Sequence, residues 1–408
     1  MSRRVVVTGM SGVTALGNDW GVIAPKLKDY KNAVRYMPEY DQYDGLNTKL
    51  AAPIENFKLP DHYTRKKTRS MGRVSKYAAL ASEVALKQSG LFGLDMLTNG
   101  KTGVAYGSCT GSTDAIGAFA RMLLEKTTRF IKANSYLQMM PHTTAVNVAI
   151  LFGLRGRVIP TSSACTSGSQ AIGYAYEAIK YGFQTAMVAG GGEELCPTES
   201  AAFDVLYATS VKNDTPETTP RPFDIDRDGL VVGEGAGTLV LEEYDHAVAR
   251  GAKIHAELVG YASTCDAGHV TEPDMKIIQR CMELALENAN LPPEAVDYIS
   301  AHGTATEKGD IAESNATSNI FGNKVPISTL KSYLGHTLGA CGAIEAWLSI
   351  EMMNSGWLHP TINLNNIDER CGDLDYIMAN GRGIDCEYIM SNNNAFGGVN
   401  TSLIFKRV

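Results

Sequence analysis

Short runs of apolar residues recur along the chain, and each is closed by glycine or a polar residue. They predict strands at 5–8, 104–106, 157–159, 186–189, 238–241, 257–259, 298–300, 325–328 and 402–405. The runs are continuous rather than alternating, which is typical of strands that are buried on both faces of a sheet.

Helical patterns lie between several of these strands. The spacing of apolar residues predicts helices at 74–90, 167–181, 275–289, 311–320 and 338–354. Alternating strands and helices predict an α/β protein with largely buried sheets. A charged, helix-like segment at 242–250 ends where a new strand begins, so we expect two similar α/β halves, 1–250 and 251–408.

Composition narrows the class of protein. The chain has 408 residues, of which 44% are hydrophobic and 20% charged, which excludes a disordered protein. Its net charge of −7 argues against nucleic-acid binding. No apolar run reaches the length of a membrane span and none resembles a signal peptide, so we expect a cytoplasmic protein without membrane insertion. The eight cysteines form no C-x-x-C pair, and we expect no metal.

The first candidate for chemistry is Cys165, within Thr-Ser-Ser-Ala-Cys-Thr-Ser-Gly-Ser-Gln at 161–170. A strand ends in small residues and a helix begins directly after the cysteine. A helix N-terminus favours a thiolate and lowers its pKa, which suits a nucleophile. The alternative is a small buried residue in a tight turn.

Two histidines follow strand ends in the second half. His302 lies in Ser-Ala-His-Gly-Thr-Ala-Thr (300–306), and His336 lies in Lys-Ser-Tyr-Leu-Gly-His-Thr-Leu-Gly-Ala-Cys-Gly (331–342). Either histidine alone is more often structural. Beside one poised cysteine, the pair fits nucleophilic acyl transfer in which the second histidine stabilises an enolate.

A turn-forming segment near the C-terminus is the fourth candidate. Phe396-Gly397-Gly398 can direct backbone N–H groups at an oxyanion, although a simple hairpin turn has the same pattern.

These four segments together, in this order and over essentially the whole chain, resemble the β-ketoacyl-acyl-carrier-protein synthases of types I and II in the thiolase-like superfamily. The resemblance implies a thiolase-like fold, two α/β halves in a layered αβαβα arrangement. It implies decarboxylative condensation of a cysteine-bound acyl primer with malonyl-acyl-carrier protein, with no separate cofactor because phosphopantetheine carries the substrates.

The resemblance also implies a role for each matching residue. Cys165 accepts the acyl chain, His302 and His336 stabilise the enolate, and Lys331 orders the site. The backbone N–H groups of Cys165 and Phe396 form an oxyanion hole, and the Phe396 side chain gates entry. The remaining matches are the supporting acids Asp310 and Glu313, and Thr304 and Thr306, which bind pantetheine.

An acidic carrier protein is the implied partner, docked on a basic patch near the pocket mouth. The matching positions are Arg65, Lys66, Lys67, Arg69 and Lys212. A solvated basic face is the alternative. We expect a homodimer, although a heterodimer with a ketosynthase-like partner is also compatible.

The chain departs from the family's Ser-Asn-Ser-Phe-Gly-Phe-Gly-Gly at three positions, Asn393, Asn394 and Ala395. Asn394 and Ala395 should alter which acyl chains pass the gate, and residues 107–112 and 139–143 should line the acyl pocket. These details resemble the ketosynthases of aryl-polyene clusters, and a fatty-acid elongation enzyme is the nearest rival. A coenzyme A thiolase and a non-catalytic chain-length-factor subunit are alternatives, which the Phe-Gly-Gly segment and Cys165, respectively, disfavour.

Overall fold

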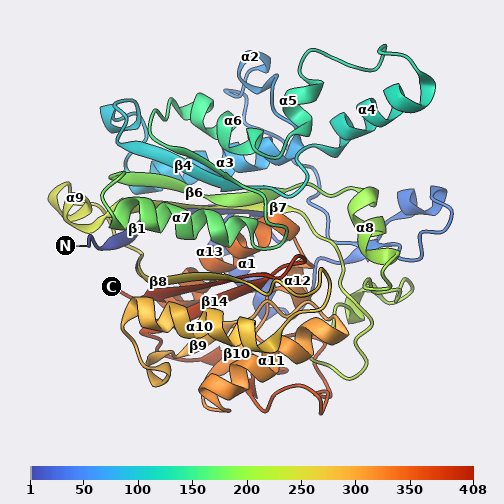
Figure 1. The fold of residues 1–408 in the computed structure, drawn as a ribbon, viewed down its shortest axis with the longest axis vertical. Helices are drawn as coiled ribbons and strands as arrows, with labels where there is room; N and C mark the ends of the chain where they lie inside the picture. The colour runs from blue at the N-terminus through green and yellow to red at the C-terminus, as the bar shows by residue number, and fades with distance from the viewer. Residues whose placement is uncertain (1) are drawn as a thin grey trace.

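A sheet of eleven strands runs through the protein, in the order β12-β10-β9-β14-β15-β8-β1-β7-β6-β4-β5 (Figure 1). The computed structural model describes residues 2–408; Met1, the first residue of the predicted N-terminal half, lies outside them. The strands of this sheet are β1 (Val5–Thr14), β4 (Thr102–Gly107), β5 (Val158–Thr161), β6 (Ala186–Glu193), β7 (Gly235–Glu243), β8 (Ala256–Cys265), β9 (Tyr298–Ser300), β10 (Pro326–Ser328), β12 (Asp375–Tyr376), β14 (Tyr388–Asn394) and β15 (Val399–Lys406).

The two halves repeat one topology. In the first half, β1 and β7 pair antiparallel, as do β7 and β6, whereas β6, β4 and β5 run parallel. In the second half, β8, β15, β14, β9 and β10 repeat this sequence of pairings. The halves join where Val5–Val7 of β1 pair with Ala256–Leu258 of β8.

Helices cover and separate the two parts of the sheet (Figure 1). Outer helices lie on each side, α7 and α13 pack together between the two parts, and the layers therefore alternate as αβαβα. The predicted α/β fold of two similar halves in a layered arrangement is confirmed. The helices are α1 (Trp20–Lys28), α2 (Arg65–Thr68), α3 (Arg73–Ser89), α4 (Thr113–Glu125), α5 (Ser135–Met139), α6 (Thr143–Phe152), α7 (Ser167–Lys180), α8 (Pro197–Asp204), α9 (Tyr244–Ala249), α10 (Met275–Ala289), α11 (Glu307–Phe321), α12 (Lys331–Leu334) and α13 (Cys341–Ser355).

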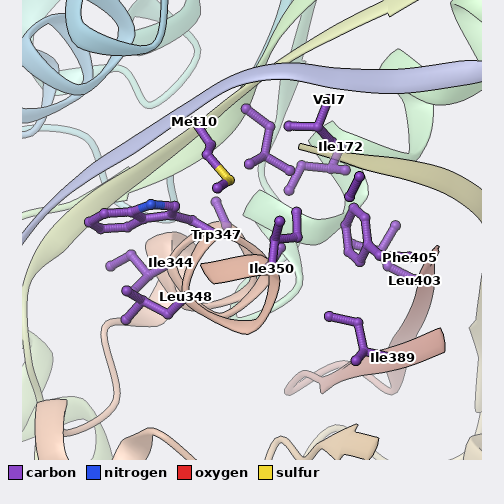
Figure 2. Packing of buried hydrophobic residues seen from close by; sticks show 14 of the residues in the cluster. Val7, Met10, Ile172, Ile344, Trp347, Leu348, Ile350, Ile389, Leu403 and Phe405 are labelled. Carbon is purple, nitrogen blue, oxygen red and sulfur yellow. The ribbon is translucent and has the colours of Figure 1, made fainter. Parts of the chain in front are cut away.

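The main core surrounds α13 (Figure 2). Trp347 and Ile350 of this helix pack in one cluster with Val7 and Met10 of β1 and with Ile172 of α7. Burying each of these large side chains contributes about 1.5–3 kcal/mol. The core thus holds α7, which follows Cys165, against α13, which follows His336.

Small residues let the two central helices approach closely. A Cβ atom at Gly168 would lie 2.9 Å from the backbone oxygen of Gly339 and 3.1 Å from the nitrogen of Ala343. Glycine at 168 is therefore a packing requirement between the two halves.

Some elements differ from the sequence prediction. β1 extends to Thr14, and β14, whose last four residues Ser-Asn-Asn-Asn are polar, had not been predicted as a strand. β14 and β15 form a hairpin, so Phe396-Gly397-Gly398 is both a hairpin turn and a part of the site described below. Among the helices of residues 2–408, none is long and apolar enough to cross a membrane.

Candidate active site

Cys165, His302 and His336 meet at the carboxyl ends of strands from both halves. Cys165 lies between β5 and α7, His302 follows β9, and His336 follows α12. The cysteine sulfur and one ring nitrogen of each histidine lie within 4.8 Å of one another, and all three residues are buried. The loops that follow β5, β9 and α12 therefore bring the three side chains together at one site.

The Cys165 thiol is held in a turn with an unusual backbone. Ala164, directly before it, has a φ of +50°, a left-handed conformation that is costly for a residue with a Cβ atom. The predicted lowering of the Cys165 thiol pKa by the helix N-terminus is wrong for the protein without substrate. Burial raises the pKa of Cys165 to about 11, against the opposing influence of the Lys331 charge and of the backbone N–H groups of Phe396 and Cys165.

His336 faces the thiol. Its Nε2 lies 2.9 Å from Cys165 Sγ, and its Nδ1 accepts a hydrogen bond of 3.2 Å from the Leu338 backbone N–H. Burial, followed by the Lys331 charge, lowers the pKa of His336 well below its ordinary value, so the ring is neutral. A neutral ring that accepts at Nδ1 carries its proton on Nε2, and His336 therefore donates toward the sulfur.

His302 is neutral for the same reasons. Burial, the Lys331 charge and the neighbouring His336 lower its pKa well below the ordinary value. The two imidazole rings are 5.2 Å apart and nearly perpendicular. Neutral imidazoles can donate hydrogen bonds to an oxygen that gains negative charge, which is the property an enolate requires.

Lys331 forms a buried ion pair, and its charge influences the pKa values of both histidines. Its Nζ lies 2.5 Å from Glu345 Oε1, and both side chains are buried. Burial is the strongest influence and acts to lower the pKa of Lys331, but the charge and hydrogen bond of Glu345, with the nearby Cys341 and Glu313, together outweigh it and the pKa is raised, so the ammonium persists. Glu345 was not among the predicted residues, although a single carboxylate within the otherwise uncharged run 341–350 was a usable signal.

The predicted supporting acids bind backbone rather than Lys331 or the histidine rings. Glu313 accepts hydrogen bonds of 2.7 Å from the N–H groups of His302 and Gly303. Asp310 accepts from the N–H groups of Thr304 and Ala305. The two carboxylates of α11 therefore fix the loop that carries His302.

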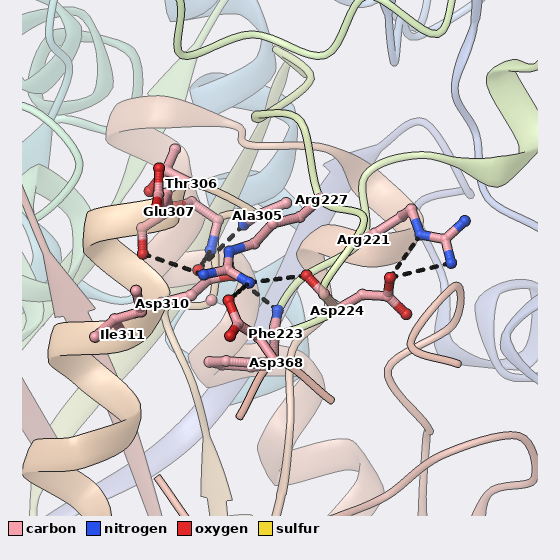
Figure 3. Close-up of polar contacts among 12 residues, drawn as sticks. Arg221, Phe223, Asp224, Arg227, Ala305, Thr306, Glu307, Asp310, Ile311 and Asp368 are labelled. Carbon is pink, nitrogen blue, oxygen red and sulfur yellow. Dashed lines mark hydrogen bonds and ion pairs between the residues drawn. The ribbon is translucent and has the colours of Figure 1, made fainter. Parts of the chain in front are cut away.

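A charged network anchors the same loop from the other side (Figure 3). Asp310 also accepts from the Phe223 N–H and lies 3.7 Å from the buried guanidinium of Arg227. Arg227 Nη1 pairs with Asp368 at 2.8 Å. This network, which the sequence analysis did not assign, ties the 221–227 segment to the His302 loop.

A cavity of about 490 Å³ leads from the surface to Cys165. The candidate residues Thr304, Thr306, Asn394, Ala395 and Phe396 line it. The hydroxyls of Thr304 and Thr306 lie 2.9 Å apart. The Phe396 ring packs on Phe203, with 5.4 Å between ring centroids, so its side chain stands beside the route to the thiol.

Two buried carboxylates hold the segment 107–112, which is expected to line the acyl pocket. Glu193 accepts a hydrogen bond of 2.7 Å from the Cys109 N–H, and the Thr110 hydroxyl lies 2.7 Å from Glu199 Oε1. Neither acid was among the predicted residues. Residues 107–112 do not line the cavity described above, and their place in an acyl pocket stays a prediction.

The candidate docking residues are divided between two places. Arg65, Lys66, Lys67 and Arg69 are exposed on or directly after α2, which Figure 1 places at the end of the molecule away from α8 and α11. Lys212 donates 3.0 Å to the Asp226 carbonyl, next to Arg227 of the cavity wall. None of the α2 residues lines the cavity, and neither does Lys212, which contacts the segment that carries Arg227 of the cavity wall; the docking patch stays a prediction.

Comparison with known proteins agrees with this geometry. Residues 2–247 match the β-ketoacyl synthase N-terminal domain, and residues 255–365 match the β-ketoacyl synthase C-terminal domain. The chain belongs to the β-ketoacyl synthase family. The 3-oxoacyl-[acyl-carrier-protein] synthase 2 of Vibrio harveyi is 38% identical over 100% of this chain and 99% of its own.

Solved structures of β-ketoacyl synthases share the fold over the whole chain. A β-ketoacyl synthase from Burkholderia phymatum is 59% identical with a TM-score of 0.98, and each chain is covered over 100% of its length. The AntDE:AntF complex, described as a type II polyketide acyl-carrier protein with its ketosynthase, is 31% identical with a TM-score of 0.89 and the same coverage. The ketosynthase ApeO with its chain length factor ApeC, from Xenorhabdus doucetiae, matches at 24% identity, 100% and 98% coverage and a TM-score of 0.84, which shows the shared fold alone.

Proposed function

We propose that the protein condenses an acyl primer, bound to Cys165 as a thioester, with a malonyl group carried by an acyl carrier protein. The proposal rests on one observation: one thiol and two neutral imidazoles lie close together in the protein interior. A protease-like pair needs one histidine. The second is accounted for when a carbanion must also be stabilised.

The first half-reaction transfers the primer. The Cys165 sulfur attacks the thioester carbonyl, the carrier's C–S bond breaks, and the carrier leaves as a thiol after taking the proton. The Phe396 and Cys165 N–H groups, which already point at the sulfur, can hold the oxyanion of the tetrahedral intermediate. The donor at His336 Nε2 stabilises the sulfur as it loses its proton.

The second half-reaction forms the carbon–carbon bond. The malonyl C–C bond to the carboxylate breaks, CO₂ leaves, and the electron pair forms an enolate whose oxygen accepts from the two histidines. The enolate carbon then attacks the acyl carbonyl, the bond to Cys165 breaks, and the sulfur leaves as a thiolate that takes a proton from solvent to restore the thiol. Burial, reinforced by the Lys331 charge, keeps both imidazoles neutral, with one N–H on each ring to donate.

The arm that delivers both substrates is phosphopantetheine in this proposal, bound along Thr304 and Thr306. No separate cofactor enters the reaction. The acyl carrier protein is the partner, and Lys212 is its contact at the mouth. The α2 residues contact it only if a second subunit brings them there, which favours a dimer, a homodimer or a pair with a ketosynthase-like subunit. The protein acts in the cytoplasm in this proposal, in fatty-acid or aryl-polyene elongation.

Intact-mass measurement tests the function directly. Incubation with an acyl-carrier thioester should add one acyl group to the wild-type protein and to a Cys386→Ala control, which removes a thiol buried away from the site, and none to Cys165→Ala. Cys165→Gln should lose condensation but retain decarboxylation of malonyl-carrier protein. Condensation that survives in Cys165→Ala contradicts the proposal.

A further inference from the structure

Asn393 lies between the ion pair behind the site and one of the two histidines. It is the sixth residue of β14, and its side chain is fully buried. The parallel register of β14 and β9 pairs Ser391 with Ser300. Asn393 and His302 each lie two residues beyond this pair, so they are neighbours.

The Asn393 amide nitrogen has three acceptors within reach. Nδ2 lies 2.7 Å from Glu345 Oε2, 3.5 Å from His302 Nδ1 and 3.7 Å from Cys341 Sγ, and the thiol sulfur is the weakest acceptor of the three. An amide carries two N–H donors, so one can serve the carboxylate and the other the imidazole. Because Glu345 holds Lys331 with its other oxygen, the contacts form one chain from Lys331 through Glu345 and Asn393 to His302.

This contact decides which nitrogen of His302 carries the proton. A neutral imidazole that accepts at Nδ1 holds its proton on Nε2. His336 receives the same constraint from a backbone N–H, that of Leu338. Both rings then present an Nε2–H, but only at His302 does a side chain impose the tautomer.

The surroundings are shaped for this amide. A Cβ atom at Gly342 would lie 2.4 Å from Asn393 Oδ1, so glycine at 342 leaves the room that the asparagine occupies. Glu345 accepts only from a donor, and this sets the orientation of the amide group. The next residue back, Asn392, points to the other face of the strand, where its Nδ2 lies 3.3 Å from Met282 Sδ.

We infer that Asn393 is a positioning residue that holds His302 as an Nε2–H donor toward the enolate oxygen. The inference rests on the proposed function and deepens it. The inference predicts different effects on the two half-reactions. Transfer of the primer to Cys165 depends on His336 and on backbone N–H groups. Decarboxylation depends on the His302 donor as well.

The test compares both half-reactions in Asn393→Leu, which keeps the volume and removes the donor, with Asn392→Leu as the matched control. Loss of a preorganised donor typically costs about 10²–10³-fold in rate. We expect kcat for malonyl-carrier decarboxylation to fall by about 10²-fold in Asn393→Leu, with KM and the rate of Cys165 acylation within about threefold of wild type. Asn392→Leu should match wild type in both.

Two further variants keep the inference open to contradiction where Asn393→Leu does not fold. Asn393→Ala removes the donor without placing a second carboxyl beside Glu345, and decarboxylation should fall as in Asn393→Leu. Asn393→Ser retains a donor and should stay at least about tenfold faster than Asn393→Ala. Decarboxylation unchanged in these variants, or an equal loss of both half-reactions, overturns the positioning role. A wild-type protein that is neither acylated nor able to decarboxylate overturns the proposed function itself.

Discussion

Lys331 and Glu345 form an ion pair in the interior, with Nζ and Oε1 2.5 Å apart and both side chains 2–3% exposed. The pair is both structural and functional, because the Lys331 charge also lowers the pKa values of His302 and His336. Removal of one partner leaves the other charge buried without compensation, which typically costs about 3–5 kcal/mol.

Lys331→Met should therefore lower the free energy of unfolding by about 3–5 kcal/mol, measured by urea denaturation. The double variant Lys331→Met/Glu345→Gln should regain part of this loss, because no charge stays unpaired. Arg280→Ala, which removes a surface ion pair, should leave the denaturation midpoint unchanged. An equal loss in the single and double variants contradicts the role of the unpaired carboxylate.

The contribution of Glu313 to stability should fall as the pH rises from about 4.5 to 7, whereas the depressed pKa values of His302 and His336 act in the opposite direction. Burial raises the pKa of Glu313 from its ordinary 4.5 to about 7, against the influence of the Gly303 and His302 N–H groups. The folded protein thus binds a proton that the unfolded chain has lost in this window. This stability is present below pH 4.5 and is lost as the pH rises through 7, and it amounts to about 3 kcal/mol. Denaturation of the wild type and of Glu313→Gln at pH 5, 6, 7 and 8 measures it as the difference between the two proteins, which should shrink as the pH rises through 7. A parallel profile in the variant contradicts this assignment.

Phe396→Ala should open the route to Cys165 and leave the oxyanion donor in place, because the donor is a backbone N–H. The Phe396 ring, which is 36% exposed, packs on Phe203 beside the cavity. Alkylation of Cys165 by iodoacetamide, followed by peptide mass mapping, should accelerate several-fold. Phe92→Ala, which removes an exposed ring from another part of the surface, is the control. Equal alkylation rates in the two variants contradict the gating role.

Charge reversal at Arg65, Lys66 and Lys67 tests whether α2 meets the carrier protein. These side chains are exposed, and a contact of exposed charges acts mainly through the association rate. The triple change to glutamate should raise KM for the carrier by about tenfold at low salt, with kcat unchanged, and the effect should shrink as salt increases. Lys212→Glu should act at the mouth in the same direction. Unchanged kinetics for the triple variant at low and at physiological salt identify α2 as a solvated face.

Gly168→Ala should separate the two central helices. The added methyl group meets backbone atoms of Gly339 and Ala343, which cannot yield as a flexible side chain does. We expect a loss of about 1–3 kcal/mol in the free energy of unfolding, with slower acylation of Cys165. Gly117→Ala is the matched control, since a Cβ atom there meets nothing within 4 Å in α4, and it should stabilise by about 0.5–1 kcal/mol.

The sequence predicted the reactive residues better than it predicted their supports. Cys165 and His302 stand just after strands and His336 just after a short helix, and local sequence pattern reveals such corners. The role of Glu345 depends on a partner 14 residues away in sequence on another helix, and that of Asn393 on a parallel strand 91 residues from it. Residue type and spacing do not encode these contacts, because the packing of the two halves creates them.

The strand that the sequence analysis missed shows the same limit. The last four residues of β14 are polar, and a polar run does not indicate a buried strand. The strand forms because β9 and β15 satisfy its backbone from both sides, and its side chains then serve the site. The polar residues at the end of β14 depart from the apolar pattern of a buried strand, and this departure indicates a functional segment.

The repeated topology leaves the two ends of the sheet unequal. At one end the two-residue strand β12 covers β10, and at the other β5 pairs with β4 alone within residues 2–408. A two-residue strand offers too short a ladder for another chain, whereas β5 offers four residues. Pairing of two β5 strands would consume the longer open edge of each molecule. No open edge of that length would then remain for a third molecule, so an assembly built through this edge would stop at two subunits.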